Sequence, residues 1–123
     1  MQDIEKLDDI KLLVDTFYQA VQLDELIGPI FNEVVANRWP QHLEKMYRFW
    51  QSILLNEPAY SGRPFPPHQK LDIHQKHFDQ WVNLFETTVC RLFEGKNADE
   101  AIKRAQLMGA LFGAKHAHLR QAN

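Results

Sequence analysis

Helical spacing of apolar residues is the feature that most constrains this chain. Apolar side chains recur every three or four residues through four segments, and no segment shows the two-residue alternation of a half-buried strand. The first helix is predicted to end near Val21, the second to begin near Pro40, the third to be capped by Gly95 and the fourth to begin near Asn97. The sequence therefore predicts an all-α fold.

Breaks in this spacing separate the predicted helices. Gly28-Pro29 interrupts the first pattern, and the short apolar set that follows predicts a tight turn and a helical corner. The stretch from Asn56 to Pro67 is rich in proline, which fixes φ and lacks an N–H donor, so it is predicted to be a loop. Asn97 and Glu100 resemble a capping box. The predicted buried face of the fourth helix comprises Ile102, Ala105, Leu107, Met108, Leu111 and Phe112.

Composition limits the classes of function. The 123 residues suit one domain spanning 1–123, and a net charge of −2 without a basic stripe argues against nucleic acid as a partner. No apolar run approaches the roughly 18 residues that would cross a bilayer, and the chain opens with acidic residues, so no membrane association is expected. Cys90 is the only cysteine, predicted to be a small apolar residue inside a helix, and the expected location is cytoplasmic.

Four of the six histidines have sequence surroundings that give little indication of ligand binding. His116 and His118 lie in what is predicted to be a polar, solvated C-terminal tail. His74 and His77 have a spacing that zinc ligands can use, but no Cys, Asp or Glu pattern completes a tetrahedral site. Surface or helix-capping roles suit that pair better than metal binding.

His68 and His42 have more informative settings. His68 directly follows Pro66-Pro67, and His42 lies near the start of the aromatic second helix, one turn before Met46. Each residue alone is compatible with a packed structural histidine. Together, two histidines from separate segments entering an apolar, aromatic cavity between helices are typical of a site that holds haem. Because the chain has no Cys-x-x-Cys-His sequence, that haem would be non-covalent haem b.

At these residues the chain resembles a known family, the group III truncated haemoglobins. The resemblance covers nearly the whole chain, and the double-glycine motifs of groups I and II are absent. The matching stretches are Thr16-Phe17-Tyr18, Leu26-Ile27-Gly28-Pro29-Ile30-Phe31, Trp39-Pro40-Gln41-His42, Phe49-Trp50, Tyr60-Ser61-Gly62-Arg63-Pro64 leading to His68, and His77-Phe78-Asp79-Gln80-Trp81-Val82-Asn83-Leu84-Phe85-Glu86.

The resemblance implies a truncated globin fold whose helices sandwich a haem pocket. It implies that His68 is the proximal iron ligand, that Tyr18, His42 and Trp81 form the distal, ligand-stabilising side, and that Phe31 packs on the haem. The further residues expected to line the haem are Met46, Phe49, Trp50, Leu71, Ile73, Phe78 and Phe112. Candidates for the propionate partners are Arg48, Arg63, Lys45 and Lys70.

The expected function is binding of dioxygen, carbon monoxide and nitric oxide, with oxygen transport as one role. Hydrogen-bond donors on the distal side also suit redox chemistry on bound oxygen, such as nitric oxide dioxygenation or peroxide turnover, supported by an unidentified reductase. A different class stays open from the residues alone. It is a haem-free helical interaction or signalling module in which His42 and His68 are packed side chains.

Overall fold

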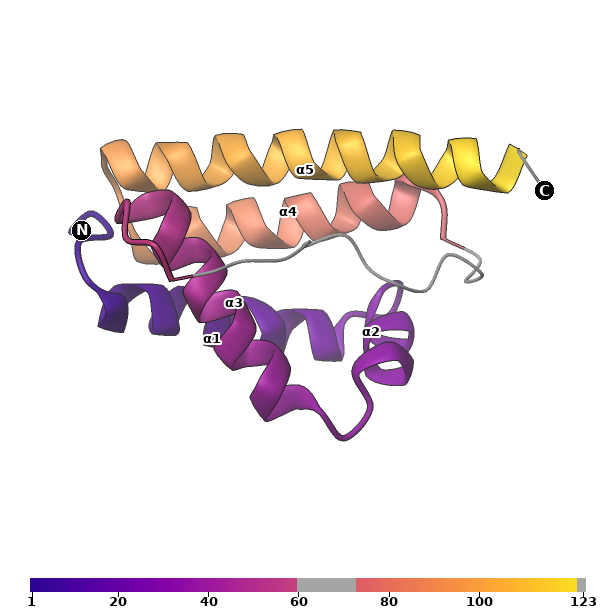
Figure 1. Cartoon of the computed structure of the whole chain (residues 1–123), viewed down its shortest axis with the longest axis horizontal. Helices are drawn as coiled ribbons and strands as arrows, with labels where there is room; N and C mark the ends of the chain where they lie inside the picture. The colour runs from indigo at the N-terminus through magenta and orange to yellow at the C-terminus, as the bar shows by residue number, and fades with distance from the viewer. Residues whose placement is uncertain (60–72, 122–123) are drawn as a thin grey trace.

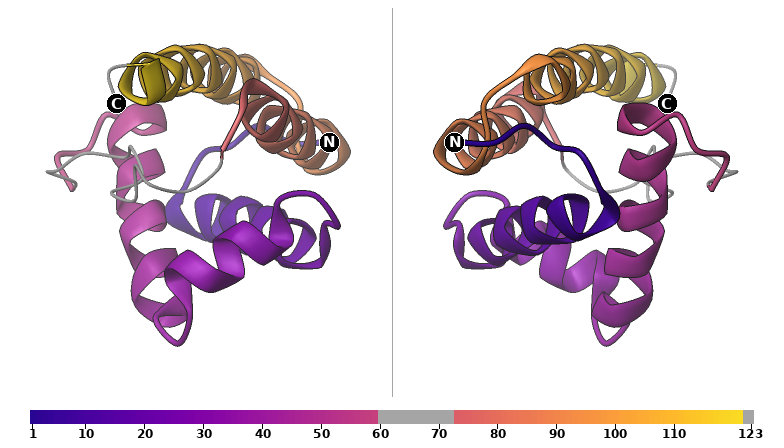
Figure 2. Two further views of the ribbon diagram at one scale, coloured as in Figure 1. Left: turned by 90° about the vertical axis from the view of Figure 1, so that its right-hand side faces the viewer. Right: turned by 90° about the vertical axis from the view of Figure 1, so that its left-hand side faces the viewer.

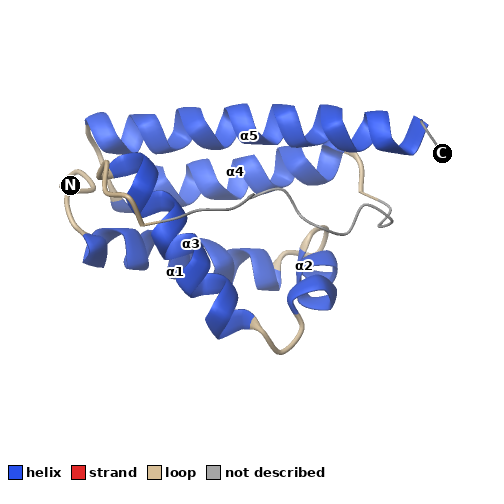
Figure 3. Cartoon of the chain, in the orientation of Figure 1, coloured by secondary structure: helices blue, strands red, loops and turns tan. Residues whose placement is uncertain are grey.

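Helices make up almost all of the part of the chain that the structure describes. The computed structural model describes residues 1–59 and 73–121. Its elements are α1 (Leu7–Leu23), α2 (Gly28–Val35), α3 (Trp39–Leu54), α4 (Gln75–Leu92) and α5 (Lys96–Gln121). No strand occurs in these two ranges (Figure 3), and the all-α prediction is confirmed.

The helices form two layers. In one layer α4 and α5 run antiparallel and side by side, while α1 and α2 lie in the other and α3 crosses at one edge (Figures 1 and 2). Helix α1 is central because it contacts α2, α3 and α4. None of the described helices has both the length and the apolar character required to cross a bilayer.

Aromatic rings fill the core where α1, α3 and α4 meet. Phe85 of α4 stacks on Trp50 of α3, with ring centroids 4.8 Å apart, and meets the ring of Phe17 from α1 edge-on at 5.1 Å. Trp81, one turn before Phe85, stacks on it at 6.0 Å. Such offset and edge-on pairs add stabilisation beyond the apolar area they bury. They also fix the relative orientation of the three helices.

Small residues, not large ones, form the buried face of α5. Leu107 and Leu111, predicted to be buried, are 52% and 57% exposed. At Gly109 a Cβ atom would collide with Val82 of α4. The two helices approach too closely here for large side chains, which is why the prediction for Leu107 and Leu111 was wrong. The buried positions are Ala98, Ala101, Ala105, Gly109 and Gly113.

The first turn of α5 is capped from the other end of the chain. The Asp3 carboxylate accepts hydrogen bonds from the backbone N–H groups of Asn97 and Ala98, both at 2.9 Å. Burial acts to raise the pKa of the Asp3 carboxyl, but the hydrogen bonds from the Asn97 and Ala98 backbones together lower it. Asn97 thus lies inside the helix, and Glu100 pairs with Arg104 at 2.8 Å. The predicted local capping box is wrong.

Two other predicted helix boundaries also differ. Helix α4 ends at Leu92, and Gly95, with φ of +143°, lies in the turn to α5 instead of capping α4. The stretch predicted to be a polar C-terminal tail is helical to Gln121.

The start of α2 explains the Gly28-Pro29 pair. These residues begin a helix as well as ending the pattern of α1, because Pro29 needs no N–H partner in a first turn. A Cβ atom on Gly28 would lie 2.8 Å from the backbone oxygen of Gln22, so only glycine allows α2 to begin this close to α1. The predicted helical corner is therefore an eight-residue helix.

We expect Gly109→Ala to lower the free energy of unfolding by about 1 kcal/mol. The gain in helix propensity of up to about 1 kcal/mol is smaller than the roughly 1–3 kcal/mol cost of overpacking against Val82. Urea denaturation of the two proteins measures the difference. As a control, Gly109→Ala introduced into a Val82→Ala variant should be neutral or stabilising; a loss of the same size in both backgrounds would contradict close packing at this point.

Candidate functional site

Tyr18 is a buried phenol in the C-terminal half of α1. It follows the core residue Phe17, and its oxygen accepts a hydrogen bond from the indole N–H of Trp81 on α4. Burial raises the pKa of the Tyr18 hydroxyl well above its ordinary range, and the Trp81 hydrogen bond offsets only part of this shift. The group is therefore protonated at neutral pH. Since the Trp81 bond uses a lone pair of the oxygen, the Tyr18 proton can be donated to a third group.

His42 brings a second polar group to the same place. It lies in the first turn of α3, and its Nε2 atom is buried without a hydrogen-bond partner among the described residues. Burial lowers the pKa of the imidazole to about 4, and the positive charges of Lys45 and Arg38 act in the same direction. The ring is therefore neutral at pH 7. A buried, unpartnered nitrogen is costly, so its presence here is typical of a site that receives a polar ligand.

Ring contacts join these groups across three helices. The Tyr18 ring lies 5.1 Å from that of His42 and 6.1 Å from that of Phe31 on α2. The structure thus brings together four of the predicted site residues, Tyr18, Phe31, His42 and Trp81.

Trp39 is a member of this group that sequence reasoning missed. Its ring lies 5.8 Å from that of Tyr18 and 5.7 Å from that of His42. The available signal was its spacing: residues three apart in a helix share a face, so Trp39 and His42 had to be neighbours once α3 was placed.

The other predicted lining residues that the structure describes fall into three sets. Met46 and Trp50 are buried on the face of α3 that His42 begins, and half-buried Phe49 meets the Trp50 ring at 5.3 Å. Ile73 and Phe78 are buried near the start of α4 but lie outside the main core cluster. Phe112 on α5 is half-buried.

Several predicted residues cannot be placed at this site. His68, Leu71, Arg63 and Lys70 lie outside the described residues. Lys45 is exposed on α3.

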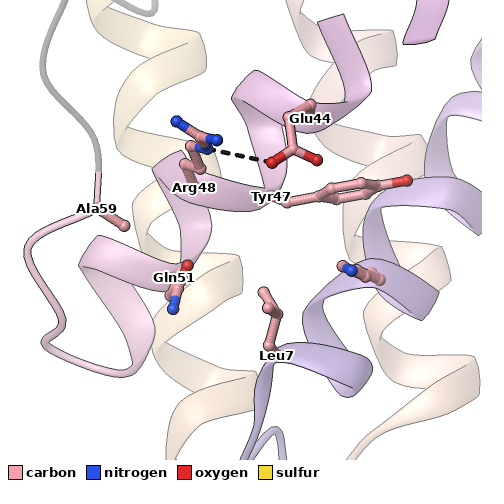
Figure 4. Close-up of a pocket in the computed structure, with 7 residues that line it drawn as sticks. Leu7, Glu44, Tyr47, Arg48, Gln51 and Ala59 are labelled. Atoms are coloured by element: carbon pink, nitrogen blue, oxygen red, sulfur yellow. Dashed lines mark hydrogen bonds and ion pairs between the residues drawn. The ribbon is translucent and has the colours of Figure 1, made fainter. Parts of the chain in front are cut away.

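Arg48 lies on the face of α3 opposite Met46 and Trp50. There it pairs with Glu44 at 3.1 Å and helps to line a surface cavity of about 370 Å³ (Figure 4). The cavity is bounded by Leu7, Lys11, Glu44, Tyr47, Arg48, Gln51 and Ala59.

The remaining candidates have structural settings. The His74 backbone N–H donates to Nδ1 of His77 at 2.8 Å, so His77 caps the start of α4, as its preferred interpretation predicted. Among the described residues no group of three His, Cys, Asp or Glu side chains could hold a metal ion. Cys90 lies inside a helix, α4, as predicted, but its side chain is exposed and does not serve as a buried apolar residue.

Comparisons with known proteins agree with this fold. Residues 4–112 match the family described as bacterial-like globin. The chain is 31% identical over 109 residues to the group 3 truncated hemoglobin ctb of Campylobacter jejuni, covering 85% of this chain and 86% of the relative. It is also similar to the crystal structure of group III truncated hemoglobin from Campylobacter jejuni, with a TM-score of 0.82, 29% identity and coverage of 94% of each chain.

The lowered pKa of His42 predicts a pH-dependent stability. The unfolded imidazole takes up a proton near pH 6.5 and the folded one only near pH 4, so the stability that this group contributes above pH 6.5 is lost as the pH falls toward 4. We expect a loss of about 1–2 kcal/mol, smaller than the full shift because solvent screens a half-buried ring.

Urea denaturation at pH 7.5 and 4.5 tests this dependence against a His42→Gln variant, which does not titrate. The wild-type protein should lose more stability between the two pH values than the variant. Equal losses would show that His42 is not held neutral by its surroundings.

Proposed function

Because the chain belongs to the bacterial-like globin family, we propose that it is a truncated globin that holds non-covalent haem b and takes up dioxygen, carbon monoxide and nitric oxide. Haem binding and an oxygen-related function are what the family implies. The haem type, the individual gases and the residue roles are our proposal. The observation that carries it is the protonated Tyr18 hydroxyl beside the buried Nε2 of His42, which no described residue hydrogen-bonds.

The described residues fit such a cofactor on its ligand side. Phe31, Met46, Phe49 and Trp50 would present an apolar wall to the flat macrocycle, with Ile73, Phe78 and Phe112 completing the lining. His68 would be the iron ligand and Leu71 would join the lining. Haem, when bound, supplies an iron centre that takes up diatomic gases.

The three polar residues would act as one unit. The Trp81 N–H occupies the Tyr18 oxygen from one side, which leaves the hydroxyl proton to be aimed into the pocket. A ligand that acquires partial negative charge there would accept a hydrogen bond from the Tyr18 hydroxyl. Neutral His42 adds a second contact through Nε2, as donor or acceptor according to its tautomer. Each hydrogen bond to a charged acceptor is worth about 1.5–3 kcal/mol.

The same donors support a proposal of redox activity. They would stabilise negative charge that develops along an O–O bond, which nitric oxide dioxygenation and peroxide turnover both require. An unidentified reductase would return electrons. Rapid mixing of the oxygen-equilibrated protein with nitric oxide tests this part, and stoichiometric nitrate formation is the expected result.

We further propose that residues 1–123 form one domain that works in the cytoplasm. The free, exposed thiol of Cys90 suits a reducing compartment.

His68→Ala should abolish normal haem binding, or leave a protein whose iron ligation is restored by added imidazole. The reason is that His77, the plausible substitute, already accepts a hydrogen bond from the His74 backbone through Nδ1. The Soret and visible spectra of the purified ferrous protein measure the outcome, with His74→Ala as the matched control. An unchanged five-coordinate spectrum would remove His68 from the iron, whereas a wild-type protein without a Soret band despite adequate haem supply would favour the haem-free helical module.

Tyr18→Phe should raise the oxygen dissociation rate constant by roughly ten- to a hundredfold, because the variant keeps the ring and loses the donor.

Trp81→Phe should also change the rate constant and shift the carbon monoxide stretching frequency while haem content stays nearly intact. If Trp81 acts through Tyr18, its substitution should add little in the Tyr18→Phe background. Stopped-flow kinetics measure all four proteins. Wild-type kinetics in Tyr18→Phe would show that the hydroxyl serves only the helix packing.

A further inference from the structure

The His42 imidazole is held between two aromatic rings. The Tyr18 ring meets it at an interplanar angle of 83° with centroids 5.1 Å apart, and the Trp39 ring meets it at 86° and 5.7 Å. Both are edge-on contacts, which are favourable arrangements for aromatic pairs. The Tyr18 and Trp39 rings are themselves 5.8 Å apart, so the three rings form one cluster.

Trp39 is fixed in place at the junction of α2 and α3. The Arg38 guanidinium donates to the Val34 carbonyl at 2.7 Å, and the Arg38 backbone N–H donates to the Val35 carbonyl at 2.9 Å. Pro40 follows in the first turn of α3, where its missing N–H costs no hydrogen bond. The backbone that carries Trp39 is therefore tied to the end of α2 and cannot readily follow a movement of His42.

The buried Nε2 atom of His42 explains why the ring contact between Trp39 and His42 is needed. Nε2 is buried and has no partner within residues 1–59 and 73–121, and rotation of the side chain toward solvent would give it a hydrogen bond to water. The inward orientation therefore needs an opposing interaction. Tyr18 supplies one ring, but Tyr18 also holds the Trp81 hydrogen bond, which fixes its own position. Trp39 supplies the second ring from the outer side, being half-buried.

We propose that Trp39 is a positioning residue that holds the His42 ring inward against Tyr18 and thereby restricts the entry of small ligands to the pocket. The part that concerns ligand entry rests on the proposed function. The part that concerns His42 does not, because the ring contacts exist in the chain itself.

Chemical labelling of His42 tests the positioning role directly. Diethyl pyrocarbonate modifies accessible neutral imidazoles, and peptide mass spectrometry gives the rate at each histidine in the purified full-length chain. Loss of an edge-on ring contact in Trp39→Ala should raise the rate at His42 by roughly two- to tenfold. Trp39→Phe, which keeps a ring, should stay near the wild-type rate. His74, the residue before α4, serves as the internal reference and should not change.

A matched control separates this effect from general loosening of the fold. Tyr47→Ala removes an aromatic ring from α3 that contacts Asp15 and Lys11 instead of His42, so it should leave the His42 rate unchanged. Trp39→Ala with a wild-type His42 rate would overturn the proposal, as would an equal increase in Tyr47→Ala.

The association rate constant of carbon monoxide tests the effect on ligand entry. Trp39→Ala should increase it, and the same change should have little effect in a His42→Ala background. An equal increase in both backgrounds would contradict a role through His42. If the protein proved to lack haem, only the proposed function would be contradicted. The labelling result would still decide the role of Trp39.

Discussion

The packing of Phe85 sets the geometry on which the rest of the molecule depends. Its ring is enclosed by Trp50 of α3, Phe17 of α1 and Trp81 of its own helix. Trp81 has two roles, because its face stacks on Phe85 while its N–H donates to Tyr18. The polar site therefore inherits its geometry from the apolar core. The position of the Tyr18 oxygen follows from the packing of an indole that is held by stacking.

Sequence reasoning succeeded where apolar and polar residues contrast strongly along a helix. The faces of α1, α3 and α4 were predictable because large apolar side chains mark them. The face of α5 was not, because alanine and glycine carry its contact with α4 and give little hydrophobic contrast. The capping of α5 was also missed, since the local Asn97 and Glu100 pattern carries no information about a carboxylate on Asp3.

At the candidate site, the resemblance to truncated haemoglobins indicated Tyr18, Phe31, His42 and Trp81, and periodicity placed only some of them on buried faces. The sequence could not show which donor and acceptor atoms of these side chains remain available for a ligand. In the part of the chain that the structure describes, Nε2 of His42 has no partner and the Tyr18 oxygen accepts from Trp81, and both facts arise from packing between helices. The contribution of Trp39 is of the same kind, since its contact with Tyr18 joins different helices.

The bond between Asp3 and the start of α5 has a consequence for the order of folding. It joins residues 94 positions apart, so the entropic cost of closing this long loop must be overcome before the first turn of α5 gains its cap. During synthesis the N-terminal segment emerges long before its partner. Its carboxylate then has no helix terminus to bind, and the contact becomes available only after residues up to Ala98 have left the ribosome. A contact of such large sequence separation is expected to form late in folding, and each of the two segments is stabilised only once the other is in place.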